Sequence, residues 1–421
     1  MLSREDNELL CRVGPGAPMG DLLREFWTVA VRSQALEADG APVRVRLFGE
    51  NFVAFRASDG RVGFFDEGCP HRCTSLALAR NEDNALTCIF HGWKIDVSGK
   101  VVEVPSEPPE RRAEFAAKVR VRHYPVREAA GAVWVYLGRS EQPPQFYNFE
   151  FAKLPASHCV PMRAVVHCNW FQAFEQVLDS AHLGILHQSW LKQIGTTMRL
   201  ATLTSPVFET LKKPYGFREG AIRDLGDGTY YARIREVVFP YFSFIPNDPP
   251  QPNFMMCAVP IDDEWNAQWL FWYDPHQPLA SFDHVPHSQT QRASGANLDN
   301  FCTDMGGPEN MWNQDRKAMK EGHFTGITKN FIYEDFAIEE AMGPIMDRSR
   351  EFLGRSDTII LTVRRALLQA ARDFRQGKQP SFMDRAIDYG SVRAAAVRYD
   401  KSVDWRAMDP LNPPPGLSVQ W

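Results

Sequence analysis

The spacing of hydrophobic and polar residues changes twice along the chain. Between residues 19 and 27 the apolar positions recur at helical spacing, which predicts a short helix. From Val43 the period becomes two, with apolar residues alternating with Arg44 and Arg46. Further short strands, separated by turn residues, are predicted at Val62–Phe65, Leu86–Cys88 and Val133–Leu137. This rhythm is typical of a small all-β domain.

A larger region is predicted after a turn-rich linker at residues 140–144. Its pattern begins with a helix over residues 170–187. Long strands of one antiparallel sheet are predicted at Tyr230–Phe239, Phe242–Ile245, Phe254–Val259 and Gln268–Tyr273. Residues 275–310, rich in Pro, Ser, Asn and Asp, predict an extended surface loop. Two later helices are predicted at Glu334–Met342 and Val363–Arg375, the second closed by Gly377.

These elements predict an α+β protein with a small all-β domain and a larger domain. In the larger domain helices cover an antiparallel sheet, similar to a helix-grip fold. We expect residues 1–40 to pack with the larger domain, residues 41–140 to form the small domain and residues 145–421 to form the larger one. A chain of 421 residues is long enough for this division.

Composition and charge exclude several classes of function. A formal net charge of −5 creates no field that would gather nucleic acid or an anionic membrane. The charged N-terminus lacks the apolar run of a signal peptide, and no apolar stretch is long enough to span a bilayer. We therefore expect a cytoplasmic protein without nucleic-acid or membrane partners.

Of the eight cysteines, only Cys69, Cys73 and Cys88 cluster, and they do so beside histidines. Cys69-Pro70-His71 is followed, after sixteen residues, by Cys88-Ile89-Phe90-His91. Each half offers one thiolate and one imidazole, the ligand set of a Rieske [2Fe–2S] centre. A Cys2His2 zinc site uses the same residue types, but zinc loops usually pair like with like. Four unrelated core residues are the remaining alternative.

A second group of possible metal ligands lies about ninety residues downstream. Asp179 and His182 are three residues apart and share a helix face. His182 and His187 are five apart, so both can reach one metal only if the helix is distorted near Gly184, by a π-bulge or an early unwinding. Two histidines and a carboxylate form the facial triad of non-haem Fe(II) oxygenases. By itself the pattern is also compatible with ordinary core and surface positions.

With both groups in view, the chain resembles the Rieske aromatic-ring oxygenases, and within them the phthalate-dioxygenase-like group of oxygenase (alpha) subunits. The resemblance runs over nearly the whole length. Besides the cluster loops it rests on Arg12–Gly20, Asn169–Glu175, Glu334-Asp335, Met342–Ile345, Asp347-Arg348, Leu353-Gly354 and Ser356-Asp357. It implies a Rieske cluster and a mononuclear Fe(II).

The resemblance also implies roles for individual residues. The mononuclear iron is expected on His182, His187 and Asp335. Asp179 is expected to bridge His182 to His71 of a neighbouring subunit, which implies a head-to-tail homotrimer or a stacked pair of trimers; the alternative is a simple helix residue or iron ligand. The competing carboxylates on the helix of Asp335, otherwise expected to form a solvated acidic face, are Glu334, Glu339 and Glu340.

Cys73 separates the two branches of Rieske proteins. Cytochrome-complex Rieske proteins carry an additional cysteine in each cluster loop, and the two form a disulfide. The second loop here offers no partner. Cys73 is therefore predicted to be a free thiol packed near the cluster, as in the oxygenase branch.

The implied reaction uses O2 and electrons from a separate NAD(P)H-dependent reductase or ferredoxin, because the chain has neither a nucleotide-binding GxGxxG nor a plant-type ferredoxin cysteine run. Its expected products in aromatic catabolism are a hydroxylated or O-demethylated aromatic carboxylate. The length and terminal sequence also resemble oxygenases that demethylate lignin-derived biaryl acids such as dehydrodivanillate. A phthalate-type cis-dihydroxylating dioxygenase is the alternative. A stand-alone Rieske electron carrier is the alternative from another class.

A substrate carboxylate favours an arginine fork. The candidates are Arg199, Arg233 and Arg235, of which the last two share a strand face; each is also compatible with a structural role. Aromatic side chains are concentrated nearby, and they either line an apolar pocket or pack in the core: Tyr230, Tyr231, Phe239, Tyr241, Phe242 and Phe244.

Overall fold

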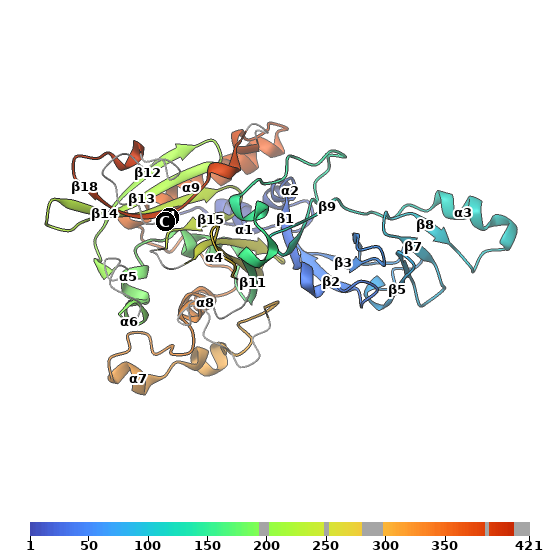
Figure 1. Cartoon of the computed structure of the whole chain (residues 1–421), viewed down its shortest axis with the longest axis horizontal. Helices are drawn as coiled ribbons and strands as arrows, with labels where there is room; N and C mark the ends of the chain where they lie inside the picture. Colours follow the sequence, from blue (N-terminus) through green and yellow to red (C-terminus); the bar gives the residue numbers. More distant parts are fainter. Residues whose placement is uncertain (193–201, 248–251, 280–297, 384–386, 408–421) are drawn as a thin grey trace.

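The computed structural model describes residues 1–192, 202–247, 252–279, 298–383 and 387–407. Within this part of the chain a small β domain projects from a larger body of strands and helices (Figure 1). The predicted α+β class and the combination of a small all-β domain with a larger antiparallel sheet are confirmed.

The small β domain contains three short antiparallel sheets among the described residues, with strand orders β2-β3-β4, β5-β6-β7-β8 and β1-β10-β9. The strands are Thr28–Arg32 (β1), Val43–Leu47 (β2), Glu50–Arg56 (β3), Val62–Asp66 (β4), Arg80–Glu82 (β5), Ala85–Thr87 (β6), Lys94–Asp96 (β7), Val101–Glu103 (β8), Val126–Ala129 (β9) and Ala132–Val135 (β10). The helix Arg112–Lys118 (α3) lies at its far end (Figure 1). In β2 the predicted alternation is observed, since Val45 and Leu47 are buried and Arg44 and Arg46 are exposed.

A separate hydrophobic core holds this domain together. Its members include Val53, Phe55 and Phe65 from the β2-β3-β4 sheet. Cys69 and Cys88 belong to the same core. The two loops that carry the predicted cluster ligands are therefore anchored by their cysteines in well-packed apolar surroundings.

The larger body is built on an eight-stranded antiparallel sheet, in the order β11-β17-β16-β15-β14-β13-β12 with β18 paired to β14. Its strands are Cys159–Val166 (β11), Val207–Lys213 (β12), Gly216–Asp224 (β13), Thr229–Val238 (β14), Phe242–Ile245 (β15), Asn253–Pro260 (β16), Asn266–Tyr273 (β17) and Ala395–Asp400 (β18). The four predicted strands are confirmed as β14 to β17. Strand β13 was not predicted, because it contains charged residues that are nevertheless buried, Arg218, Glu219 and Arg223.

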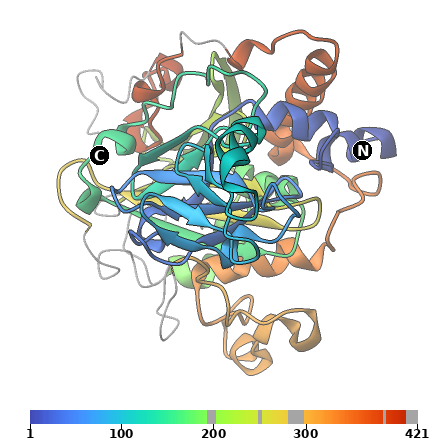
Figure 2. The same cartoon turned by 90° about the vertical axis from the view of Figure 1, so that its right-hand side faces the viewer.

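The helices of the larger body are Arg4–Cys11 (α1), Pro18–Arg24 (α2), Trp170–Leu178 (α4), Leu183–Leu186 (α5), Gln188–Leu191 (α6), Arg316–Lys320 (α7), Phe331–Ala341 (α8) and Thr358–Arg375 (α9). The predicted helices near residues 19–27, 334–342 and 363–375 are confirmed as α2, α8 and α9. Both N-terminal helices pack against α9, so the N-terminal segment lies beside this late helix (Figure 2). The structure confirms a turn at Gly377, whose φ is 78°.

The single helix predicted over residues 170–187 is wrong. α4 ends at Leu178, Asp179 adopts an extended conformation, and α5 begins only at Leu183. The Asp179 carboxylate accepts a hydrogen bond from the backbone N–H of Ala181 at 2.7 Å, a local bond that competes with helical hydrogen bonding. The distortion expected near Gly184 is found earlier, between Leu178 and Leu183, and Gly184 itself lies inside α5.

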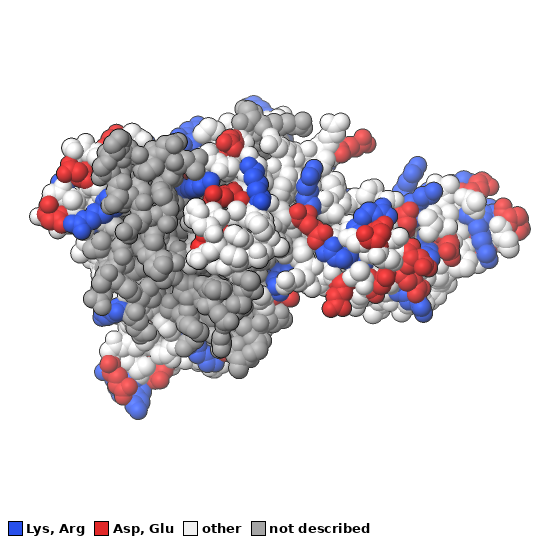
Figure 3. All heavy atoms as spheres, in the orientation of Figure 1, with Lys and Arg blue, Asp and Glu red and all other residues white. Residues whose placement is uncertain are grey.

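The surface of the described residues adds two observations. No described helix is both long enough and apolar enough to cross a membrane. Acidic and basic side chains are intermixed over the projecting small domain (Figure 3). The predicted loop over residues 275–310 lies partly outside the described residues; at 275–279 and 298–307 it contains no helix or strand.

Candidate metal centres and active site

Two loops of the small β domain share one backbone arrangement. The N–H of Cys69 donates to the carbonyl five residues later, and its carbonyl accepts from the N–H of Cys73. Cys88 makes the same two bonds, with the carbonyl five residues later and with the N–H of Gly92. Cys73 and Gly92 both have positive φ, 59° and 71°. The loops are therefore structural equivalents that present their side chains toward one another.

These loops bring two thiols and two imidazoles together. Cys69 and Cys88 are buried, and burial together with the adjoining Cys88 thiol raises the pKa of the Cys69 thiol to about 11. The Nδ1 atoms of His71 and His91 lie 3.1 Å apart. Trp93 stacks on the His71 ring, with centroids 4.6 Å apart and planes at 9°. The donor set, with thiols inside and imidazole nitrogens outside, fits a Rieske cluster.

Cys73 is a free cysteine, as predicted, but it is exposed rather than packed. It occupies the left-handed backbone position that the second loop fills with Gly92. A side chain at such a position costs about 1–2 kcal/mol, which glycine avoids.

We expect Cys73→Gly to keep the full cluster and to be at least as stable as the natural protein. The left-handed position no longer carries a Cβ, and the exposed thiol makes no contribution as a ligand. Cluster content is measured by iron and sulfide analysis and by the EPR spectrum of the reduced cluster. Stability is measured by thermal unfolding. Cys73→Ser, which keeps the Cβ, is the control; loss of the cluster in the glycine variant would show that the thiol is required.

The second group of predicted ligands meets where α5 faces α8. One side-chain atom from each of His182, His187 and Asp335 lies within 4.8 Å of the others. Asp335 Oδ1 is 2.9 Å from His187 Nε2 and 3.8 Å from His182 Nε2. The break after α4 places the two histidines at opposite ends of α5, so residues five apart converge. Among the described residues no other three His, Cys, Asp or Glu side chains have ligand atoms that all lie within 4.8 Å of one another.

The protonation of these residues suits a metal. Burial lowers the pKa of both His182 and His187, which favours the neutral imidazole that binds metals. Burial raises the pKa of Asp335 to about 7, and the nearby Asp179 carboxylate acts in the same direction. A divalent cation among these three side chains would stabilise the carboxylate. The donor set therefore fits a mononuclear Fe(II).

The other acids of α8 do not form a solvated face, and that expectation is wrong. Glu334 and Glu339 are fully buried. Glu334 Oε2 lies 2.6 Å from His187 Nδ1, and Glu339 accepts a hydrogen bond from Gln268 at 2.5 Å. Glu340 accepts from the Trp312 indole at 2.7 Å. Their partners come from distant parts of the chain, which residue spacing along one helix cannot show.

Asp179 lies directly after α4, next to the group of possible iron ligands. Its Oδ2 is 3.8 Å from His182 Nδ1, beyond hydrogen-bond distance. That nitrogen is buried and has no hydrogen-bond partner among the described residues. The His182 ring is thus less constrained than the His187 ring.

Gln176 is a site residue that the sequence analysis missed. Its Nε2 donates to Asp335 Oδ1 at 2.6 Å and lies 3.2 Å from His182 Nε2. The available signal was its position three residues before Asp179, on the same helix face. The side chain places an amide among the three possible ligands.

The two arginines predicted on one strand face line the same cavity as the three possible iron ligands. Arg233 and Arg235 project from β14 and are both buried. The Nε and Nη1 atoms of Arg235 are buried and have no hydrogen-bond partner in the part of the chain that the structure describes, and Nη1 is 3.9 Å from Glu219 Oε2. Burial raises the pKa of Glu219 to about 7. Arg199, the third candidate, lies outside the described residues.

The apolar wall of this cavity is made by other residues than the aromatic set named above. It consists of Val177, Leu183, Ile245, Phe254, Met256, Trp272, Phe331 and Ile332. Phe239, Tyr241, Phe242 and Phe244 lie in the main hydrophobic core, and Tyr230 packs on Tyr399. For these aromatic residues, core packing is the alternative that is confirmed.

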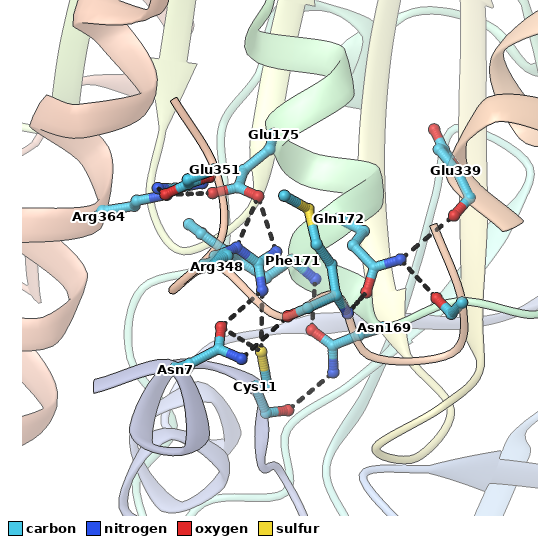
Figure 4. Close-up of polar contacts among 12 residues, drawn as sticks. Asn7, Cys11, Asn169, Phe171, Gln172, Glu175, Glu339, Arg348, Glu351 and Arg364 are labelled. Atoms are coloured by element: carbon cyan, nitrogen blue, oxygen red, sulfur yellow. Dashed lines mark hydrogen bonds and ion pairs between the residues drawn. The ribbon is translucent and has the colours of Figure 1, made fainter. Parts of the chain in front are cut away.

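A buried polar network fixes the helix that leads to Asp179 (Figure 4). Glu175, in the last turn of α4, accepts two hydrogen bonds from Arg348 at 2.9 and 2.7 Å and is also paired with Arg364. Arg364 pairs in turn with Glu351, and Arg348 donates to Asn7 at 3.0 Å. Because removing one member would leave a buried charge unpaired, the network holds α4, α1 and the C-terminal segments together.

Comparison with known families completes the assignment. Residues 26–125 match the Rieske [2Fe–2S] domain, and residues 135–413 match the family described as LigXa C-terminal domain like. The chain belongs to the Rieske oxygenases. It is an oxygenase (alpha) subunit of this family of oxidoreductases, whose members carry a Rieske cluster and a mononuclear iron.

Three curated relatives match nearly the whole Rieske oxygenase chain. The phthalate 4,5-dioxygenase oxygenase subunit of Pseudomonas putida is 37% identical, over 96% of this chain and 94% of its own. The 3-chlorobenzoate-3,4-dioxygenase oxygenase subunit of Comamonas testosteroni is 35% identical, over 96% and 97%. The 5,5'-dehydrodivanillate O-demethylase oxygenase subunit of a Sphingobium strain is 30% identical, over 91% and 84%.

Solved structures show the same fold. NdmA of Pseudomonas putida CBB5 with caffeine has a TM-score of 0.60 and 16% identity, with 92% of this chain and 99% of that chain covered. Dicamba monooxygenase bound to dicamba has a TM-score of 0.57 and 16% identity, with 85% and 99% covered.

Proposed function

We propose that this Rieske oxygenase hydroxylates or O-demethylates an aromatic carboxylate. The observation that carries the substrate class is the position of Arg233 and Arg235 in the wall of the cavity that His182, His187 and Asp335 also line. The names of the three relatives, which refer to phthalate, 3-chlorobenzoate and dehydrodivanillate, support the same class.

We assign the Rieske cluster to Cys69, His71, Cys88 and His91. The support is their convergence in two equivalent loops, with the thiols buried and the imidazoles toward the surface. In this arrangement the cysteine side chains tie the cluster to the core of the small domain. The histidine side chains lie on the side from which electrons can leave.

We assign the mononuclear iron to His182, His187 and Asp335. When bound, Fe(II) supplies the activation of O2 beside the substrate. The protein's own contribution is to present two neutral imidazoles and one carboxylate on one side, and to line the other side with apolar side chains that limit water. Arg233 and Arg235 then orient the substrate within this cavity.

Asp179 is proposed to bridge His182 to His71 of a neighbouring subunit. The unpartnered Nδ1 of His182, 3.8 Å from the Asp179 carboxylate, supports this role, since a modest movement would complete the hydrogen bond. A head-to-tail homotrimer, or two stacked trimers, follows from such a bridge. Sedimentation analysis of the metal-loaded protein tests the assembly.

Arg235 provides the sharpest test of the substrate class. A hydrogen bond to a charged group contributes about 1.5–3 kcal/mol. We therefore expect Arg235→Gln to raise KM for the aromatic carboxylate roughly 10- to 100-fold with a smaller effect on kcat. The methyl ester of the same substrate should show no such difference between the two proteins.

The control is Arg398→Gln, which removes an exposed arginine on the neighbouring strand β18 that pairs with Asp227. It should leave KM unchanged. Equal KM values for Arg235→Gln and the natural enzyme would exclude Arg235 from carboxylate binding, and Arg233→Gln then tests the other member of the pair.

The reaction itself is tested by O2 uptake with a surrogate reductase over phthalates, benzoates and methoxylated biaryl acids. Formaldehyde release from a methoxylated acid would identify an O-demethylase. A cis-dihydrodiol from phthalate would identify the alternative, which the higher identity to the phthalate relative favours. Failure on every carboxylate, with turnover of a neutral aromatic compound, would contradict the proposed substrate class.

A separate reductase or ferredoxin remains the proposed electron donor, and the likeness to a carbazole dioxygenase solved with its ferredoxin supports it. The match to a catalytic C-terminal domain argues against a stand-alone electron carrier. Iron analysis distinguishes an oxygenase from a stand-alone carrier, since a carrier holds about two irons per chain and the oxygenase about three.

The domain limits of 1–40, 41–140 and 145–421 stay a prediction. A cytoplasmic location likewise stays a prediction.

A further inference from the structure

Helix α8 surrounds the His187 ring with three of its own side chains. Phe331 stacks on the ring, with centroids 3.9 Å apart and planes at 20°. Glu334 Oε2 lies 2.6 Å from Nδ1, and Asp335 Oδ1 lies 2.9 Å from Nε2. Because residues at i, i+3 and i+4 share one helix face, a single helix delivers all three contacts. The ring is therefore held at its face and at both nitrogens.

Glu334 is an unusual residue to place there. Its side chain is fully buried, and among the described residues its only ion-pair partner is His187. Its second oxygen accepts a hydrogen bond from the Thr325 hydroxyl, which in turn accepts from the N–H of Ile327 at 3.1 Å. A buried carboxylate without an arginine or lysine is costly unless another positive charge lies near. A cation bound through His187 would supply that charge.

His182 offers the contrast. Within the described residues its Nδ1 is buried without a hydrogen-bond partner, and the Asp179 carboxylate oxygen is 3.8 Å away. His187, in contrast, has a carboxylate oxygen close to each ring nitrogen, at 2.6 and 2.9 Å. The two rings therefore differ in how firmly the protein orients them.

We propose that Glu334 is a positioning residue that selects the metal-binding tautomer of His187. By accepting a hydrogen bond from Nδ1–H it keeps the proton on Nδ1 and leaves Nε2 unprotonated, so the lone pair of Nε2 points to the place beside Asp335 where a metal would lie. Thr325 keeps the carboxylate in the required orientation. The inference rests on the proposed function, because it takes His187 as an iron ligand.

The test is the affinity of the mononuclear site for Fe²⁺ in Glu334→Gln. The protein is freed of mononuclear iron with a chelator while the Rieske cluster is retained, and it is then titrated anaerobically with Fe²⁺ alone. The carboxamide can donate to Nδ1 and so stabilise the tautomer with the proton on Nε2, which cannot bind a metal. We expect the dissociation constant to rise roughly 10- to 100-fold. The cluster EPR signal and the thermal unfolding midpoint should be unchanged.

Two further variants separate positioning from simple destabilisation. Glu340→Gln removes a charge from the same helix but not from His187, and it should bind Fe²⁺ as the natural protein does. Thr325→Val removes only the second hydrogen bond of Glu334 and should weaken Fe²⁺ binding to a smaller extent. If Glu334→Gln does not fold, the Fe²⁺ affinity of Thr325→Val tests the positioning role instead: weakened binding supports it, and natural affinity contradicts it.

The outcomes distinguish this inference from the proposed function. If Glu334→Gln folds and binds Fe²⁺ with natural affinity while His187→Ala does not bind it, the ligand assignment stands and the role of Glu334 is refuted. If His187→Ala also keeps the natural affinity, the ligand assignment itself is refuted. Weakened binding in Glu334→Gln with natural affinity in Glu340→Gln supports the proposal.

Discussion

Replacing Asp335 by alanine is expected to remove the mononuclear iron while leaving the Rieske cluster intact. Asp335 Oδ1 is the atom that both histidine Nε2 atoms approach, at 2.9 and 3.8 Å, so its loss leaves two imidazoles without a shared anionic partner. Loss of an outer contact of a metal ligand costs roughly 10- to 100-fold in affinity or activity, and loss of the ligand itself should cost more than that. We expect turnover at the limit of detection, and iron falling by about one per chain.

The measurements are iron content, the EPR spectrum of the reduced cluster and substrate-dependent O2 uptake. Asp347→Asn is a suitable control, because Asp347 is an exposed turn residue that accepts from Ser349. Both variants should retain the cluster signal. An Asp335→Ala protein with full mononuclear iron would show that another carboxylate is the ligand, and Glu334 would be the first to test.

Replacing Asp179 by asparagine is expected to lower turnover while both metal centres remain loaded. Asparagine has the same shape and keeps an oxygen that can accept from the N–H of Ala181, so the break after α4 should survive. The charge that attracts the Nδ1 proton of His182 is lost. We expect turnover to fall roughly 10- to 100-fold.

Single-turnover experiments locate the defect. With reduced cluster, substrate and O2, cluster oxidation should be slow in Asp179→Asn, whereas the iron content matches that of the natural enzyme. Asp400→Asn, which changes an exposed aspartate next to Ser402, should oxidise its cluster at the natural rate. If Asp179→Asn turns over at the natural rate, the bridging role is contradicted, and Asp179 serves only to end helix α4.

The cluster loops were the part of the site most accessible to prediction. Cys69 and His71, like Cys88 and His91, lie within one tight loop each, so local sequence specifies both halves of the donor set. The structure added that the two loops are equivalent and that Cys73 matches Gly92. The exposure of Cys73 was not predictable, because it depends on how the loop lies on the core.

The mononuclear site was predictable in its residues but not in its geometry. His182, His187 and Asp335 were named from spacing and resemblance, and the structure brings them together. The distortion was expected near Gly184, yet the helix is interrupted earlier, at Asp179, whose side chain accepts a hydrogen bond from Ala181 where α4 ends. Glycine only permits a break in a helix. The Asp179 carboxylate provides a local hydrogen bond that competes with the backbone hydrogen bonds of the helix.

Several polar residues were predicted poorly because their partners are remote. Glu334 pairs with His187, and Gln176 contacts Asp335, across 147 and 159 residues. The buried charges of β13 hid that strand from a search for apolar alternation. Charged residues are predicted to be exposed unless a partner is known, and only the folded chain shows the partner.

The amino-acid sequence by itself determined the class of this protein: two Cys–His pairs, a histidine pair downstream, a small β domain and a larger sheet. Those features depend on short-range spacing, which the backbone geometry of loops, strands and helices converts directly into shared faces. Tertiary structure alone decided that Arg233 and Arg235 face the possible iron ligands and that Glu334 supports His187. Such contacts join β14, α5 and α8, and their energies depend on burial that no local pattern specifies.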